Sequence, residues 1–261
     1  MLTVLAVGLL TAAVVMTVTA LIARAIGRVA VVDVAWGLGF VAIAVITALV
    51  GDGDATRRWL LPVLVATWGL RLAWHIRRRA VGAGEDPRYE QLLGGPVREV
   101  GFGVAVRKVF VVQGAAMWFI SLPVQVAAAR QVSWWPVVVA GCVLWLVGVV
   151  FEATGDAQLA AYKKDPDRGP VMDRGLWGWT RHPNYFGDAC VWWGLWLAGG
   201  LASGWLPGLL TVLAPVAMTW FLVFATGARL LERTMMKRPG YPEYAARTSM
   251  FFPLPPKRGR A

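Results

Sequence analysis

Residues 134–164 read WWPVVVAGCVLWLVGVVFEATGDAQLAAYKK, an apolar run followed by a polar ending. The run before Glu152 carries no charge and is long enough to cross a bilayer, and the two leading tryptophans are typical of a membrane interface. The polar ending places four residues at steps of four, three and four, which is one face of a helix: Glu152, Asp156, Leu159 and Lys163. We therefore expect a membrane helix that continues beyond the bilayer with a ligand-facing stripe. The alternative is a solvated helix end.

The composition of the whole chain favours a polytopic membrane protein over a soluble domain. Of its 261 residues, 57% are hydrophobic and 16% charged. The pattern predicts an all-α fold in a single membrane domain over residues 1–261. The first apolar run lacks a preceding basic segment, so we expect it to stay as a membrane helix. The seven predicted spans are about 2–23, 29–50, 59–76, 109–129, 134–153, 185–202 and 206–228.

The net charge of +11 does not indicate a nucleic-acid partner, because the charges are divided between the two sides of the predicted spans. Arg57, Arg58 and Arg130 are assigned to loops on one side, and the other 23 Lys and Arg to the opposite side. Such a bias predicts an outside amino end and a cytoplasmic carboxyl end, in a bacterial cytoplasmic membrane. Membrane lipids are then the surrounding partners. Cys142 and Cys190 fall in apolar segments, and no metal site is expected.

Three polar residues in the first half of the chain are candidates for catalysis. Asp33 lies near the end of an uncharged span, where it either serves a site or pairs with Arg24 or Arg28. His75 lies beside a basic membrane anchor and is either a spectator or a proton donor. Gln113 lies in a helix that Pro123 should bend, and a bent polar helix can line a cavity. The polar segment 84–92, GEDPRYEQL, is either a salt-bridged cap or part of a ligand site.

A second dense polar run, residues 181–188 (RHPNYFGD), begins the next apolar segment. Backbone N–H groups at a helix start favour an anion, so we expect a phosphate or carboxylate site there. The alternative is an Arg-His anchor before a proline-started helix. Further on, Glu232 is expected to face the same side, Tyr241 to lie in a short amphipathic helix, and 254–261 to form a basic tail. The cofactor candidates in this region are Lys164, Arg168, Arg174, Arg181, His182, Asn184, Tyr185, Asp188, Glu232 and Tyr241.

Several familiar nucleotide and hydrolase signatures are missing from the sequence. It contains no Rossmann glycine fingerprint, Walker loop, HExxH or Ser-His-Asp signature. Any nucleotide would therefore bind to a scaffold of membrane helices.

Five segments together resemble the bacterial DUF1295 membrane proteins, a group similar to the carboxyl-terminal domain of steroid 5-alpha-reductases. They are DVAWGLGF, GEDPRY, FEATGDAQLAAYKK, RGLWGWTRHPNYFGD and RPGYPEYAARTSMFFP. The resemblance implies a seven-helix oxidoreductase that holds NADPH in its cytoplasmic half, with residues 151–253 as the cofactor-binding part. It would pass hydride to the C=C bond of an alpha,beta-unsaturated carbonyl lipid, such as a 3-oxo-4-ene steroid.

The resemblance also assigns roles to residues. The reductase stripe Asn-x3-Asp-x2-Leu-x3-Arg matches Glu152, Asp156, Leu159 and Lys163, with Glu in place of Asn and Lys in place of Arg. The reductase box matches Asn184 and Asp188. The basic residues expected to grip the diphosphate and the 2'-phosphate are Lys163, Lys164, Arg168, Arg174 and Arg181.

The chain departs from the reductases at the catalytic positions. They polarise the substrate carbonyl with a Glu and with the Tyr of a His-Tyr-x-x-Arg stretch, where this chain has Trp74, His75 and Arg78. Asp33, His75 or Gln113 would have to substitute. A similar RHPNY box occurs in isoprenylcysteine carboxyl methyltransferases and phospholipid N-methyltransferases. One alternative is therefore an S-adenosylmethionine-dependent methyltransferase of a lipid or prenyl carboxylate, and another is a non-catalytic lipid-binding membrane protein.

Overall fold

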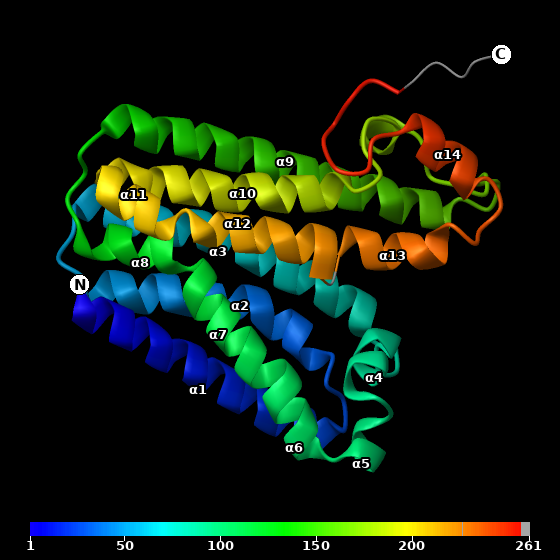
Figure 1. Ribbon diagram of the computed structural model, residues 1–261, viewed down its shortest axis with the longest axis horizontal. Helices are drawn as coiled ribbons and strands as arrows, with labels where there is room; N and C mark the ends of the chain where they lie inside the picture. The colour runs from blue at the N-terminus through cyan, green and yellow to red at the C-terminus, as the bar shows by residue number, and fades with distance from the viewer. Residues whose placement is uncertain (226, 257–261) are drawn as a thin grey trace. The chain divides into compact units, whose positions relative to one another are not determined.

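A computed structural model describes residues 1–225 and 227–256 (Figure 1). These residues form helices and loops without a β-strand, which confirms the all-α prediction. Six helical stretches in the described part are long and apolar enough to cross a membrane: Leu2–Ile26, Val31–Val50, Ala55–Ala80, Phe102–Ile120, Trp135–Lys164 and Trp205–Met235. The chain is therefore a polytopic membrane protein. The remaining predicted span, 185–202, corresponds to a helix of 17 residues, so the number of spans and their orientation stay predictions.

The chain divides into two compact units. Unit 1 comprises Met1–Val138 and Ala198–Ala214, and unit 2 comprises Val139–Leu197 and Pro215–Ala261. The single membrane domain expected over 1–261 stays a prediction. Of the expected basic tail, residues 257–261 lie outside the described residues.

Unit 1 contains three long helices and several short ones. Its elements are α1 (Leu2–Ile26), α2 (Val31–Val50), α3 (Ala55–Ala80), α4 (Pro87–Leu93), α5 (Val97–Val100), α6 (Phe102–Ala105), the π-helix η1 (Val106–Val111), α7 (Val112–Ile120), α8 (Leu122–Ala129), the 3-10 turn η3 (Leu201–Ser203) and α11 (Trp205–Thr211). The helix break at Ser121, one residue before α8 and two before Pro123, confirms the predicted bend. The polar stretch 80–108, whose composition favours a single long loop, instead contains α4, α5 and α6. Asp86 caps α4, which begins at Pro87 and is followed by Gly94. These are local signals for a helix, but the helix is too short to show a hydrophobic periodicity.

The start of α3 corrects the placement of Arg57 and Arg58 in a loop. Both lie in the first turn of α3, where the Asp54 carboxylate accepts the Arg57 backbone N–H at 2.9 Å. The Arg57 side chain is fully buried. Its guanidinium donates to Ser203 Oγ at 2.8 Å and to a set of backbone carbonyls: Ala127, Arg130, Gln131 and Gly199. Arg57 thus ties together three segments of unit 1 that are distant in sequence.

Unit 2 is built on two neighbouring helices, α9 and α10, which run side by side in Figure 1. Its elements are α9 (Trp135–Lys164, from Val139 on), the 3-10 turn η2 (Gly175–Gly178), α10 (Pro183–Gly199, up to Leu197), α12 (Leu213–Trp220, from Pro215 on), the π-helix η4 (Phe221–Ala225), α13 (Ala228–Met235) and α14 (Tyr241–Arg247). The helix α9 continues to Lys164 without a break, as predicted from the stripe.

Glycines bring α9 and α10 into close contact. Gly141, Gly148 and Gly155 recur every seven residues on α9, and Gly187 and Gly194 do so on α10. A Cβ added to Gly148 would lie 2.5 Å from the Gly187 carbonyl oxygen, and one added to Gly194 would lie 2.6 Å from the Gly141 carbonyl oxygen. Small residues of this kind let helix backbones approach each other in a membrane. The polar ends of α9 and α10 therefore face each other at short range.

Candidate functional site

Three buried carboxylates gather where α9 meets the start of α10. On α9, Glu152 is 3% exposed and Asp156 is 9% exposed, and Asp188 of α10 is also buried. The Asn184 amide donates to Asp156 Oδ1 at 3.2 Å. A Cβ on Gly187 would lie 2.9 Å from Glu152 Cβ, so the glycine makes room for Glu152 beside Asp188. Carboxyl oxygens accept hydrogen bonds, so the site suits a ligand that presents hydroxyl or amide donors.

An open cleft of about 530 Å³ lies where α9 ends. It is lined by the last turns of α9, by residues 165–175, and by Gly240 and Arg247. The loop after α9 folds back onto the helix, since the Leu176 N–H donates to Gln158 Oε1 and the Trp177 indole N–H to the Gly155 carbonyl, both at 3.0 Å. The volume lies within the range of small-molecule sites.

Charged side chains of both signs line this cleft. Arg247 forms an ion pair with Asp173. Arg168 donates to the Lys163 carbonyl at 3.0 Å. The side chain of Arg174 is exposed and makes no hydrogen bond or ion pair with the residues that the structure describes. Arg174 is therefore a cation available to a ligand phosphate or carboxylate.

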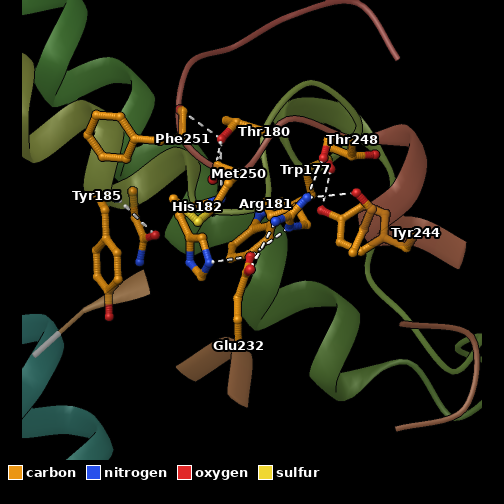
Figure 2. Close-up of polar contacts among 12 residues, drawn as sticks. Trp177, Thr180, Arg181, His182, Tyr185, Glu232, Tyr244, Thr248, Met250 and Phe251 are labelled. Carbon is orange, nitrogen blue, oxygen red and sulfur yellow. Dashed lines mark hydrogen bonds and ion pairs between the residues drawn. The ribbon is translucent and has the colours of Figure 1, made fainter. Parts of the chain in front are cut away.

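Arg181 is held inside the protein, as Figure 2 shows. Its Nε and Nη2 donate to the two Glu232 oxygens at 2.6 and 2.9 Å, and its Nη1 donates to the carbonyls of Ala245 and Thr248 at 2.8 and 2.5 Å. Burial lowers the pKa of Arg181, but hydrogen bonds and charge attraction from Glu232 outweigh it and raise the pKa above its ordinary value. The arrangement favours a structural clasp over a ligand-binding role for this guanidinium.

His182 also contacts Glu232, the ion-pair partner of Arg181. Its Nε2 lies 3.1 Å from Glu232 Oε1, and its ring stacks on Tyr185 with centroids 5.4 Å apart. All four members of this cluster are predicted cofactor ligands and are labelled in Figure 2: Arg181, His182, Tyr185 and Glu232. Their roles as ligands stay predictions.

The carboxyl-terminal segment is fastened to the loop before α10. The Thr180 hydroxyl donates to the carbonyls of Met250 and Phe251 at 3.2 and 2.9 Å, and the Tyr244 hydroxyl donates to the Trp177 carbonyl at 2.5 Å (Figure 2). Tyr241, a predicted cofactor residue, is buried in α14, where burial and then the Glu232 charge raise its pKa to about 12. Residues 244–251 are therefore hydrogen-bonded to the loop that precedes α10 in unit 2.

Unit 1 holds a separate polar cluster around Asp33. The Tyr89 hydroxyl donates to Asp33 Oδ1 at 2.5 Å, Arg88 Nη2 donates to Asp33 Oδ2 at 3.2 Å, and the Gln113 amide donates to the Tyr89 oxygen at 3.3 Å. Burial, and then the charge of Asp33 and the hydrogen bond to it, raise the pKa of Tyr89. Tyr89 therefore keeps its proton at neutral pH and acts as a hydrogen-bond donor.

The segment 84–92, which includes most of α4, also supplies caps for two helices. The Glu85 carboxylate accepts the backbone N–H groups of Val29 and Ala30, at 2.5 and 2.9 Å, at the start of α2. The Asp86 carboxylate caps α4 and pairs with Arg88 at 2.8 Å. Burial raises the pKa of Asp86, but the hydrogen bonds from Arg88 hold it below its ordinary value.

The structure brings some predicted site residues together and leaves others apart. Glu152, Asp156, Asn184 and Asp188 lie at the α9–α10 contact, and Asp33 and Gln113 both contact Tyr89. Of the other predicted residues on α9, Leu159 is half-buried, and Lys163 and Lys164 are exposed. His75 is half-buried near the end of α3.

Two contributors were missed by sequence reasoning. Tyr89 was noted only as part of a charged loop, and Tyr162 was not singled out at all. Tyr162 lies four residues after Gln158 on the same face of α9, and both line the cleft. That spacing was a signal available in the sequence. No such signal was available for the contact of Tyr89 with Asp33, since 56 residues separate them.

Comparison with known proteins identifies the family alone. Residues 19–248 match the family described as protein of unknown function DUF1295. No curated protein and no solved structure matches the chain. Because the match extends over most of the sequence, including both polar clusters, the chain belongs to the DUF1295 family.

Proposed function

We propose that this membrane protein is a reductase that uses NADPH to reduce the C=C bond of an alpha,beta-unsaturated carbonyl lipid. The observation that supports this best is a change in polarity along unit 2. Buried carboxylates lie at the α9–α10 contact, and arginines lie at the exposed cleft where α9 ends. A nicotinamide nucleotide has the same division, since its amide and ribose hydroxyls donate hydrogen bonds and its phosphates attract guanidinium groups. The resemblance to steroid 5-alpha-reductases points the same way.

The residues of unit 2 fit such a ligand by their chemistry. Asp156 and Glu152 would accept hydrogen bonds from hydroxyl or amide groups, and Asn184, already bonded to Asp156, would fix the orientation of that carboxylate. Arg174 would bind phosphate, with Arg168 beside it in the cleft. When bound, NADPH supplies the hydride.

Reduction of an enone also needs a hydrogen-bond donor that stabilises negative charge on the carbonyl oxygen. In unit 1, the Tyr89 hydroxyl donates its one proton to Asp33 Oδ1, whereas the Gln113 amide donates one N–H to the Tyr89 oxygen and has a second N–H for such an oxygen. The catalytic role of Asp33, Gln113 and His75 stays a proposal about unit 1 by itself. The substrate class, a hydrophobic carbonyl lipid, agrees with a site in a membrane protein.

The same carboxylates favour one competing function. A buried carboxylate can also stabilise a sulfonium or ammonium group, as S-adenosylmethionine carries, although that cofactor has no phosphate for Arg174 to bind. A non-catalytic lipid-binding protein would need neither the carboxylates nor the arginine.

A ligand titration distinguishes these functions. Purified protein in mild detergent would be titrated with NADPH, NADH and S-adenosylmethionine while thermal unfolding is followed, because a ligand specific for the folded state raises the transition. We expect NADPH to raise it. Arg174→Ala should weaken NADPH about tenfold or more through loss of a charge-assisted contact, and Asp156→Asn should weaken it as well.

Arg238→Ala is the matched control, since this exposed arginine of unit 2 does not line the cleft. An unfolding transition that NADPH and NADP leave unchanged contradicts the proposal. A rise with S-adenosylmethionine alone moves the protein to the methyltransferases. Once binding is found, NADPH consumption with a 3-oxo-4-ene steroid tests the reaction itself.

A further inference from the structure

A second cleft, in unit 1, lies where α1 ends. It encloses about 360 Å³ between residues 23–27 and residues 97–102. Two arginines, Arg24 and Arg98, line it, and no acidic residue does. The cleft therefore carries a net positive charge that its own lining does not balance.

Glycines at two turns give the cleft its shape. Gly27 ends α1 at φ 68°, and Gly101 joins α5 to α6 at φ 87°, two conformations that glycine adopts without strain. A Cβ added to Gly27 would lie 3.6 Å from Arg98 Nη2, so the Arg98 guanidinium lies over the end of α1. The two arginines thus reach the same cleft from segments that are distant in sequence.

Arg24 and Arg98 have no side-chain partner among the residues that the structure describes. Both are exposed, and neither makes a hydrogen bond or ion pair with any residue in the described ranges 1–225 and 227–256. Nearby arginines differ, since Arg28 donates to the Ala80 carbonyl at 2.9 Å and Arg88 binds Asp33. Two like charges that share a cleft repel each other unless an anion lies between them. The pair is thus arranged for an anionic ligand.

The place of the cleft indicates what kind of anion it receives. The helix α1 is a candidate membrane span, Leu2–Ile26, and the cleft lies at its last residues. Leu21, Ile22 and Ile26 expose 62%, 46% and 58% of their surfaces there, and Phe102 lines the cleft itself. A ligand that satisfies both features carries a phosphate beside apolar chains. We propose that Arg24 and Arg98 bind the phosphate of an anionic phospholipid headgroup.

The test titrates phosphatidylglycerol into delipidated protein in a neutral detergent and follows thermal unfolding, with phosphatidylcholine and inorganic phosphate as parallel titrations. Phosphatidylglycerol should raise the transition most. The variant Arg24→Gln/Arg98→Gln should bind it about tenfold more weakly or worse, because two charge-assisted contacts are removed. Arg98→Lys, which keeps a point charge, should retain part of the effect.

A matched control removes the same charge elsewhere in unit 1. Arg107→Gln/Arg130→Gln alters two exposed arginines of unit 1 that do not line the cleft, and it should keep the full response to phosphatidylglycerol. An equal loss in both double variants means that general surface charge binds the lipid, which overturns the proposal. So does a response to inorganic phosphate as large as that to phosphatidylglycerol, because the ligand would then be a free anion. The transitions of the variants without lipid report whether they fold.

Discussion

In unit 1, Asp33 is held by side chains from 55 and 56 residues further along the chain, whereas in unit 2 Asp156 meets Asn184 across two consecutive helices. The unit 1 cluster depends on side-chain hydrogen bonds made by the short helix α4. The unit 2 cluster depends on how closely two backbones approach at glycines. The contrast shows that buried polar groups can be positioned by long-range side-chain bonds or by backbone packing, and the two arrangements respond differently to substitution.

Removal of the Arg57 side chain should have the largest effect and would show how far unit 1 depends on polar bonds. Arg57→Ala leaves Ser203 Oγ and several buried carbonyls without their donor, and we expect a loss of about 3–5 kcal/mol in the free energy of unfolding. Arg130→Ala is the control, because its side chain is exposed while its carbonyl is unchanged. Denaturant or thermal unfolding in detergent measures both. Equal stability of the two variants would mean that the Arg57 side chain does not hold the three segments of unit 1 together.

A single methyl group at Gly148 tests the backbone packing of unit 2. The added Cβ of Gly148→Ala would lie 2.5 Å from the Gly187 carbonyl oxygen, so α9 and α10 must separate. We expect a loss of about 1–3 kcal/mol, as for other overpacked sites, and weaker binding of any ligand at Asp156. Gly84→Ala serves as control, since its added Cβ would meet nothing within 4 Å. If Gly148→Ala matched the control in stability, glycine contact would not be what positions the carboxylates.

The smallest expected effect concerns one hydroxyl in unit 1. Tyr89→Phe removes the donor to Asp33 and the acceptor for Gln113, while Arg88 still binds Asp33, and we expect a loss of about 1 kcal/mol. Tyr162→Phe removes a hydroxyl that bonds the Gly169 carbonyl at an exposed position, so it should lose less. Thermal unfolding compares the two. A larger loss in the free energy of unfolding for Tyr162→Phe than for Tyr89→Phe would contradict this prediction.

Periodicity and local signals predicted much of the fold. The continuation of α9 to Lys164 followed from the stripe, and the helix break at Ser121 followed from Pro123. The glycine spacing on α9 and α10 was present in the sequence and could have indicated their contact. These features depend on residues within a few helical turns of one another, which is the range over which a sequence pattern carries structural information.

Long-range contacts were beyond the reach of that approach. The burial of Arg57 depends on carbonyls 70 to 142 residues away, and its charge alone indicated a loop. Tyr89 reaches Asp33 across 56 residues, and the neighbouring Glu85 bonds the start of α2 across 55 and 56 residues. The pairing of Arg181 with Glu232 likewise spans 51 residues. Such contacts are fixed by tertiary packing, which a single sequence does not display.

Because the glycines of α9 and α10 recur every seven residues, the number of residues between a glycine and a carboxylate sets the direction in which that carboxylate points around the helix axis. Each residue added to a helix rotates everything beyond it by about 100° and advances it by about 1.5 Å. One residue inserted between Gly148 and Glu152 would keep the first glycine contacts and swing both carboxylates away from α10. An insertion of seven would return them to nearly the same side, about 10 Å further along. The direction in which Glu152 and Asp156 point is therefore set by a count of residues from Gly148.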